Sequence, residues 1–334
     1  MPAYFGLDIG STSIKLIQVD GSRVKMIGIG GNPFGKNIMA MTNSEKITLT
    51  DSLKTLIKES GLREKKVVAS IPEALVFSKV LKFPVMSSPE LSTAIKWELD
   101  QSVPFPPSEV ETSWVILEKP EKFAGDEKIA VYVVAVPTNV SESYVQIMDL
   151  VGLEPVRLEN EIPALTRTFV DSLSDASPAI IVDLGASGTN IVASGKDKIF
   201  SNYYIPVGGL AMTKQITDAF GLPVDQAESY KRTYGISKDQ LEGKVLAVLK
   251  PVVDNLIGEI KKMMIAYHDE HQETSINKLI LTGGGAYLPG LIPYLTESFA
   301  GTEVVIGDVF SDLAVEAKYK GLGPVFSISY GLAI

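Results

Sequence analysis

The sequence predicts an α/β protein made of two related domains, with a small α+β module inserted into the first domain. The first observation is a repeat: Asp8 to Val24 aligns without a gap on Asp183 to Ile199, and each copy reads as strand, tight turn, strand and turn. The second is that strands and helices alternate after each copy, which is typical of α/β domains. The third is a change of pattern between Pro84 and Arg157, where no glycine-rich ligand loop occurs.

The first copy of the repeat continues into a third strand that ends at Gly30 and Gly31, so it forms a three-strand meander. Apolar residues at helical spacing then predict a helix within residues 44–60. Two apolar runs predict strands at 67–71 and 76–83.

The inserted module is expected to contain both helices and strands. In chain order we expect helix 89–101, strand 111–117, strand 128–136, helix 139–151 and a short strand after Gly152. Charged residues 118–127 predict a hairpin loop between the first two strands. The first domain is expected to resume with a helix from Glu159 to Leu173.

The second copy of the repeat leads into a strand that ends at Gly208 and Gly209. After it we expect helices 210–220, 225–234 and 244–272, strand 279–282, and a helix that begins near Pro289. The predicted first domain is therefore 1–83 plus 158–176, the inserted module 84–157, and the second domain 177–334. Within the second domain, 220–275 is expected to be mostly helical and 324–334 to return to the first domain.

Composition excludes several classes of protein. The chain has 334 residues and a net charge of −9, from 31 Lys plus Arg and 40 Asp plus Glu, so we expect no nucleic-acid partner and no direct binding to anionic lipid. It contains no cysteine, which excludes disulfides and thiolate chemistry. The longest apolar run, Ile129 to Val136, is far shorter than the roughly 20 residues that span a bilayer. The start of the chain reads as a strand rather than a signal peptide, and we expect a cytoplasmic protein.

The turn of each repeat has the residues that a phosphate site needs. Glycine and small residues allow backbone N–H groups to approach phosphate oxygens, and both turns consist of such residues. The first turn is Gly10-Ser11-Thr12-Ser13 and the second is Gly185-Ala186-Ser187-Gly188. Asp8 and Asp183 precede these turns at strand ends, where each can hold a hydrated Mg²⁺ ion. Lys15 follows the first turn and could reach the phosphates as a point charge.

A third glycine-rich turn lies at Gly283-Gly284-Gly285, after an apolar strand and before a predicted helix. Such turns let a ligand approach the backbone, although they are also common structural turns in α/β proteins. Its position after the two Asp hairpins favours a ligand site.

Three other features have weaker functional readings. The segment from Gly30 to Asn37 has the glycine and lysine spacing of a Walker loop, but it has Asn37 where the motif needs Ser or Thr, which favours an exposed loop. His268 and His271 could share a metal, but the sequence offers no third ligand, which strongly favours a solvated helix face. Trp97 and Trp114 are expected to be core or interface aromatics of the inserted module.

The segments DIGSTSIK, DLGASGTN and LTGGGA resemble the two phosphate motifs and the adenosine motif of the actin, hexokinase and heat-shock chaperone ATPase superfamily. Within that superfamily, KWELDQSVPFP, YIPVGG and the ending SISYGLAI resemble the PilM family of type IV pilus assembly proteins. The FtsA family of division proteins is similar, but it would add a membrane-targeting helix after the position of Ile334. The resemblance implies actin-like (ribonuclease H-like) duplicated domains with an inserted module.

The resemblance also assigns residues to ATP and Mg²⁺. Those matching the two phosphate motifs are Asp8, Gly10, Ser11, Thr12, Ser13 and Lys15, then Asp183, Gly185, Ser187, Gly188 and Thr189. Those matching the nucleoside contacts are Gly208, Gly209, Glu228, Lys231, Gly283, Gly284 and Gly285. Glu161 matches the catalytic glutamate of the chaperone connecting helix, with capping of its helix as the alternative. For Glu228 and Lys231 the alternative is an exposed helical ion pair.

The function that the resemblance implies is an ATP-binding platform of the type IV pilus, with weak ATPase activity at most. Its implied partner is the N-terminal cytoplasmic peptide of PilN, bound between the inserted module and the first domain. Other pilus inner-membrane components and self-association are also implied, and recruitment to the inner face of the membrane would occur only through a partner. The alternatives are an FtsA-like division filament protein and a phosphotransferase of the sugar-kinase type, which would need an acidic general base in the cleft.

Overall fold

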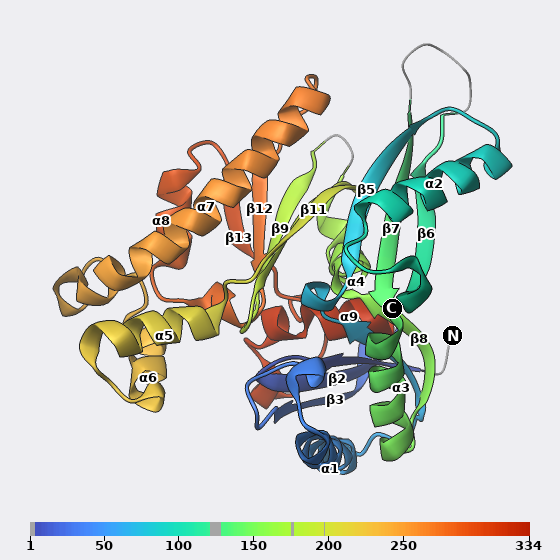
Figure 1. Ribbon diagram of the computed structural model, residues 1–334. Helices are drawn as coiled ribbons and strands as arrows, with labels where there is room; N and C mark the ends of the chain where they lie inside the picture. The colour runs from blue at the N-terminus through green and yellow to red at the C-terminus, as the bar shows by residue number, and fades with distance from the viewer. Residues whose placement is uncertain (1–3, 121–127, 175–176, 197) are drawn as a thin grey trace.

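The computed structural model describes residues 4–120, 128–174, 177–196 and 198–334. Two five-stranded sheets of identical topology form the body of the molecule, and a three-stranded sheet stands beside the second of them (Figure 1). In each large sheet three strands form an antiparallel meander and two further strands add in parallel. The repeat predicted from the sequence is therefore present as two equivalent sheets.

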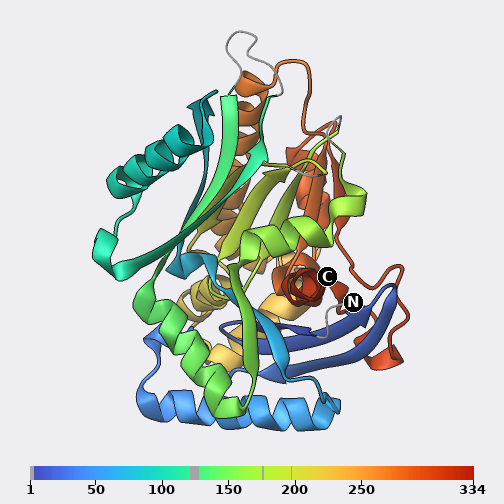
Figure 2. The same ribbon diagram turned by 90° about the vertical axis from the view of Figure 1, so that its right-hand side faces the viewer.

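The first sheet has the order β3-β2-β1-β4-β8. Its strands are β1 (Phe5–Ile9), β2 (Ser13–Asp20), β3 (Arg23–Gly31), β4 (Lys66–Ile71) and β8 (Glu154–Asn160). Helices α1 (Asn43–Ser60) and α3 (Thr138–Val151) cover one face of this sheet, at the bottom of Figure 2. A capping box between Thr42 and Glu45 begins α1, and Gly61, with a φ of 69°, ends it.

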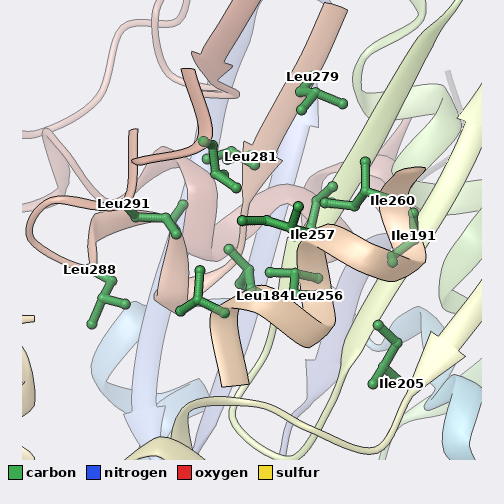
Figure 3. Close-up of a cluster of buried hydrophobic side chains, with 14 of the residues drawn as sticks. Leu184, Ile191, Ile205, Leu256, Ile257, Ile260, Leu279, Leu281, Leu288 and Leu291 are labelled. Carbon is green, nitrogen blue, oxygen red and sulfur yellow. The ribbon is translucent and has the colours of Figure 1, made fainter. Parts of the chain in front are cut away.

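The second sheet has the order β11-β10-β9-β12-β13. Its strands are β9 (Ala179–Leu184), β10 (Thr189–Ser194), β11 (Ile199–Ile205), β12 (Lys278–Thr282) and β13 (Glu303–Ile306). Four helices belong to this half: α5 (Gly209–Phe220), α6 (Val224–Tyr234), α7 (Lys244–Glu270) and α8 (Leu291–Ser298). Figure 3 shows how Leu256, Ile257 and Ile260 of α7 pack toward Ile191 and Leu281 of the sheet.

Two short helices cross between the halves of the molecule, α4 (Glu161–Thr168) and α9 (Ser327–Ala333). Ile162 of α4 is buried among side chains of the second sheet, although the chain reaches α4 directly from β8 of the first. Leu332 of α9 is buried against Val68 of the first sheet. Arg167 Nε donates to the carbonyl oxygen of Gly331 over 2.9 Å, which joins the two helices. The end of the chain thus packs on the first sheet.

The three-stranded sheet has the antiparallel order β5-β7-β6. It contains β5 (Phe77–Pro84), β6 (Val110–Glu118) and β7 (Lys128–Pro137), and α2 (Ser88–Ser102) covers its outer face (Figure 2). β5 lies next to β11 of the second sheet. Residues 121–127 of the predicted hairpin loop lie outside the described part of the chain.

The strand memberships differ from the boundaries 84 and 157 that the sequence suggests for the inserted module. β5 belongs to the small sheet because Leu81 and Phe83 face the apolar side of α2. By contrast, β8 pairs with β4, and Tyr144 of α3 lies in the core of the first half. The small sheet and its helix therefore span residues 77–137. We call this segment the inserted module from here on.

Trp97 and Trp114 are both in the inserted module and are not part of its core. Their exposed fractions are 64% and 41%.

In the part of the chain that the structure describes, no helix is long and apolar enough to cross a bilayer.

Candidate functional site

The turns of the two repeats face each other across the space between the large sheets. Each turn is closed by one backbone hydrogen bond, from Gly10 N to Ser13 O in the first and from Gly185 N to Gly188 O in the second, both 3.0 Å long. Ser11 Oγ of the first turn donates to Ser187 Oγ of the second over 2.9 Å. The structure therefore brings together the two hairpins that the sequence singles out.

A carboxylate lies beside each turn, and each has a partner on the neighbouring strand. Lys15 Nζ donates to Asp8 Oδ2 over 2.8 Å, and Asn190 Nδ2 donates to Asp183 Oδ2 over 3.3 Å. Lys15 and Asn190 occupy equivalent positions of the repeat, directly across the strand pair from their aspartates. Asn190 is a site residue that the sequence analysis missed, and the repeat alignment carries the signal that could have found it.

Glu161 joins the same group of side chains from the first turn of α4. Its Oε2 accepts a hydrogen bond of 2.9 Å from Asn190 Nδ2 and one of 3.1 Å from the backbone N–H of Glu73. Asn190 thus links Glu161 to Asp183. The side chain of Glu161 points back into the site rather than serving its own helix as a cap.

Asp8, Asp183 and Glu161 place three carboxyl groups close together in a buried site, which disfavours the charged forms of Asp183 and Glu161. Burial and the nearby Asp8 carboxylate raise the pKa of Asp183 to about 6, with Lys15 offsetting part of the effect. Burial and the charges of Asp183 and Asp8 raise the pKa of Glu161 to about 8. A cation between the carboxylates would relieve this repulsion. Mg²⁺ takes one or two carboxylates and completes its shell with water and phosphate oxygens, so Asp8 and Asp183 fit it.

These pKa shifts predict how stability depends on pH in the absence of metal and nucleotide. Glu161 has a higher pKa in the folded state than the usual 4.5, so its contribution to stability is present below pH 4.5 and is lost as pH rises through about 8. We expect the free energy of unfolding to fall by roughly 2 kcal/mol between pH 6 and 8 from this group alone. Urea unfolding at both pH values measures it.

The control for this prediction is a pair of Gln variants. Glu161→Gln should reduce the dependence on pH, whereas Glu142→Gln, at an exposed position on α3, should leave it as in the wild type. Buried Glu73 also has a raised pKa, of about 7, so some dependence will persist in Glu161→Gln. An unchanged slope in Glu161→Gln would contradict the electrostatic account of the site.

The second turn also holds the start of α5. The backbone N–H groups of Gly209 and Leu210 donate to the carbonyl oxygens of Gly185 and Ala186 over 3.0 and 2.9 Å. A Cβ at Gly208 would lie 2.6 Å from the Gly185 oxygen, so only glycine permits this close approach. Helix α5 therefore begins directly at the second turn.

Glu228 and Lys231 form a partly buried network with α5 rather than an isolated pair on a helix surface. Lys231 Nζ donates to Glu228 Oε2 over 2.6 Å and to the carbonyl oxygen of Gly209 over 2.9 Å. Thr213 Oγ1 of α5 also donates to Glu228 Oε2, over 2.5 Å. Burial would raise the pKa of Glu228, but its hydrogen bonds from Lys231, Thr213 and Arg232 outweigh burial and lower it to about 2. The pair fastens α6 to the start of α5.

The glycine-rich turn after β12 lies against the second aspartate. Gly283 has a φ of +77°, and a Cβ there would lie 2.5 Å from Asp183 Oδ1. Gly284, the next residue, has nothing within 4 Å of such a Cβ. Gly284 begins a short 3₁₀ turn, Gly284–Tyr287, and α8 then begins at Leu291, two residues after Pro289.

Gly283→Ala and Gly284→Ala form a matched pair for testing this turn. Alanine at 283 must adopt a left-handed conformation and displace Asp183, so we expect a loss of about 2–4 kcal/mol in the free energy of unfolding. Alanine at 284 meets no neighbour and should change stability by less than about 1 kcal/mol. Thermal and urea unfolding of the two variants measure this difference. Equal stabilities would contradict the described packing of the turn on Asp183.

The remaining predicted residues surround the same turns. Thr189 is buried and donates to the carbonyl oxygen of Val207 over 2.8 Å, and the Thr12 carbonyl oxygen accepts from Asn32 N over 3.0 Å. Asn32 also donates through Nδ2 to the carbonyl oxygens of Gly10 and Lys36, which makes the Walker-like segment a structural support of the first turn.

His271 lies at the far end of α7, where its ring stacks on Tyr267. Within the described residues, no group of three His, Asp or Glu side chains is placed to hold a metal.

The comparisons with known proteins agree with this architecture. A solved structure of a "PilM-PilN type IV pilus biogenesis complex" contains a chain with 25% sequence identity and a TM-score of 0.85, and the match covers 99% of this chain and 98% of that one. The ethanolamine utilization protein EutJ from Carboxydothermus hydrogenoformans is similar in fold alone, with 16% identity, a TM-score of 0.59, and coverage of 100% of this chain and 89% of that one.

The predicted fold class, a duplicated actin-like α/β fold, is therefore confirmed. The model of the family described as type IV pilus assembly protein PilM matches residues 6–334. With nearly the whole sequence matched, this chain belongs to the PilM family of type IV pilus assembly proteins.

Proposed function

We propose that the site between the two large sheets binds Mg-ATP and that the chain acts as a nucleotide-dependent platform in type IV pilus assembly. The observation that carries the proposal is the pair of equivalent hairpins, whose turns are in contact through Ser11 and Ser187 and whose aspartates are both buried. Two turns of small residues supply backbone donors for phosphate oxygens from opposite sides. Asp8 and Asp183 would hold Mg²⁺, which would neutralise phosphate charge.

The nucleoside would lie between the other glycine-rich segments. Gly208 and Gly209 begin α5 at the second turn, and Gly283 lies beside Asp183 and Gly285 beside Leu184. Glu228 and Lys231, which are joined to Gly209, are the side chains that we assign to the ribose and adenine. This arrangement supports a nucleotide that extends from Asp8 across the second turn toward α6.

Hydrolysis at this site is expected to be slow, with Glu161 orienting the attacking water. The water oxygen would form a bond to the γ-phosphorus as the bond to the bridging oxygen breaks, so ADP leaves with the electron pair and the water's proton passes to Glu161 or to the released phosphate. Only the carboxylate form of Glu161 can accept a proton. The two turns and the metal would hold the nucleotide without by themselves placing a water in line with the γ-phosphate, so turnover below about 1 s⁻¹ is the expectation.

The proposed partner is the N-terminal cytoplasmic peptide of a PilN-type membrane protein. Support comes from the solved PilM-PilN complex, which contains a chain whose match covers 99% of the present chain. We place the peptide between the inserted module and the first domain, as the family resemblance implies, with the peptide bound in an extended conformation. Cytoplasmic location and recruitment to the inner membrane through this peptide follow from the proposal.

Intrinsic tryptophan fluorescence offers a direct test, because the only two tryptophans of the chain, Trp97 and Trp114, lie in the inserted module. Titration with a synthetic peptide of the PilN N-terminus should shift the emission and saturate, whereas a scrambled peptide should not. In cells, the protein should leave the membrane fraction when the PilN tail is removed. Membrane association in cells that lack every pilus membrane component would contradict the proposal.

A further inference from the structure

Another buried carboxylate, apart from those of the nucleotide site, lies where three parts of the molecule meet. Glu73 follows β4 of the first sheet and is 5% exposed. Its Oε1 accepts hydrogen bonds from Ser78 Oγ of the inserted module and, over 3.4 Å, from Asn202 Nδ2 of β11. Its Oε2 accepts a bond of 2.7 Å from Asn160 Nδ2, at the junction of β8 and α4. One side chain therefore contacts the first sheet's edge, the inserted module and the second sheet.

The backbone of the same residue contacts the nucleotide site. The N–H of Glu73 donates to Glu161 Oε2 over 3.1 Å, and this bond and the bond from Asn190 are the two that fix the Glu161 carboxylate. The orientation of the Glu161 carboxylate thus depends on the position of the Glu73 backbone N–H. That backbone is in turn held by a side chain with partners in all three parts of the molecule.

Burying this carboxyl group has a cost that a purely structural role would not require. Replacing a buried polar cluster as a whole by hydrocarbon often costs little stability, whereas burial raises the pKa of Glu73 to about 7 despite its hydrogen bonds. Asn160 Nδ2 also donates to Tyr132 Oη over 2.5 Å, so the polar cluster continues into β7 of the inserted module. A polar junction of this kind specifies one relative position of its parts rather than adding much stability.

The seam between the inserted module and the second half has other contacts that avoid Glu73. Lys82 of β5 pairs with Glu270 at the end of α7 over 2.5 Å, and Glu118 of β6 pairs with Lys198 over 2.9 Å. Ser78 is on the same strand as Lys82, and Asn202 Nδ2 donates to Ser78 Oγ over 2.7 Å. Among these seam contacts, only Ser78 and Asn202 are hydrogen-bonded to the Glu73 side chain, whose backbone N–H contacts Glu161.

We propose that Glu73 is a positioning residue that sets the orientation of Glu161 according to how the inserted module docks on the second sheet. The inference rests on the proposed function in assigning Glu161 to the attacking water. It extends that function by giving the inserted module, and whatever binds it, a physical connection to hydrolysis. The connection runs from Asn202 and Ser78 through the Glu73 side chain to the Glu73 N–H.

The test compares four variants of the full chain. Asn202→Ala removes the hydrogen bonds that the second sheet donates to Glu73 and Ser78. Glu73→Ala removes the buried carboxylate. Glu73→Gln keeps the size of the side chain, and its amide can still pair with Asn160 when the Asn160 amide flips. Lys82→Ala is the control, because it breaks an ion pair of the same seam but no bond of the cluster. Hydrogen–deuterium exchange of the segments 72–78 and 161–168, Mg-ATP affinity and single-turnover hydrolysis are measured for each.

In Asn202→Ala and Glu73→Ala we expect exchange in segment 72–78 to accelerate about tenfold and the single-turnover rate to fall about tenfold, with Mg-ATP affinity within about threefold of the wild type. Glu73→Gln and Lys82→Ala should resemble the wild type in all three measurements. If Glu73→Ala does not fold, Asn202→Ala decides the question. Wild-type exchange and turnover in Asn202→Ala, or the same losses in Lys82→Ala, would overturn the inference. Absence of Mg-ATP binding in the wild type would overturn the proposed function instead, and the exchange measurement would still test the positioning of segment 72–78.

Discussion

Replacing Asp8 or Asp183 by alanine is expected to weaken Mg-ATP binding at least about a hundredfold, which corresponds to about 3 kcal/mol. Both carboxylates are buried and lie beside turns in direct contact, so each would supply part of the metal's anionic environment. Asp8→Ala also leaves the largely buried Lys15 without its carboxylate partner. Isothermal titration calorimetry with Mg-ATP measures the loss.

Asp20→Ala is the matched control for this prediction. Asp20 is at the other end of the β2 strand that carries Lys15, and it is a partly exposed residue paired with Lys25. Its removal should leave nucleotide affinity unchanged. Calorimetry that gives wild-type affinity in both Asp8→Ala and Asp183→Ala would exclude the hairpins as the nucleotide site.

Glu161→Gln is expected to lower the single-turnover rate of ATP hydrolysis about a hundredfold while Mg-ATP affinity changes less than about threefold. The amide keeps the size of the side chain and can still accept a hydrogen bond from Asn190 or Glu73, but it cannot take a proton from water. Rapid quench of pre-bound ATP measures the rate, and a parallel titration measures the affinity.

Glu154→Gln, at an exposed position on the strand that leads into α4, is the control for the loss of one carboxylate. Equal rates in the wild type and Glu161→Gln would remove Glu161 from the mechanism. A multiple-turnover rate of the wild type well above about 1 s⁻¹ would instead favour an ordinary phosphotransferase.

The local signals of the sequence were sufficient for the hairpins and for the glycine turn beside Asp183. Asp8 and Asp183 are each the next-to-last residue of a buried strand that runs into a turn of small residues, and such a turn forms from its own residues and its strand partner. The duplicated topology followed because the two copies repeat the same pattern of strands. A signal that lies within one hairpin can be read from the sequence without knowledge of the rest of the fold.

Contacts between distant segments could not be predicted in this way. Glu73 reads as an ordinary polar residue after a strand, and its burial arises only when Ser78, Asn160 and Asn202 converge on it. β5 has the same alternation whether it joins the first sheet or the small one, so its membership depends on α2. Trp97 was expected to be in a core or an interface, and its exposure on the surface of α2 excludes the core.

A crystal structure with a non-hydrolysable ATP analogue and Mn²⁺ in place of Mg²⁺ tests the central claim most directly, because anomalous scattering locates the metal independently of the nucleotide. We expect one metal peak between the carboxylates of Asp8 and Asp183, phosphate oxygens at the turns Gly10 to Ser13 and Gly185 to Gly188, and the base near Lys231. A nucleotide bound elsewhere in the molecule, or at these turns with the metal away from both aspartates, would contradict the account.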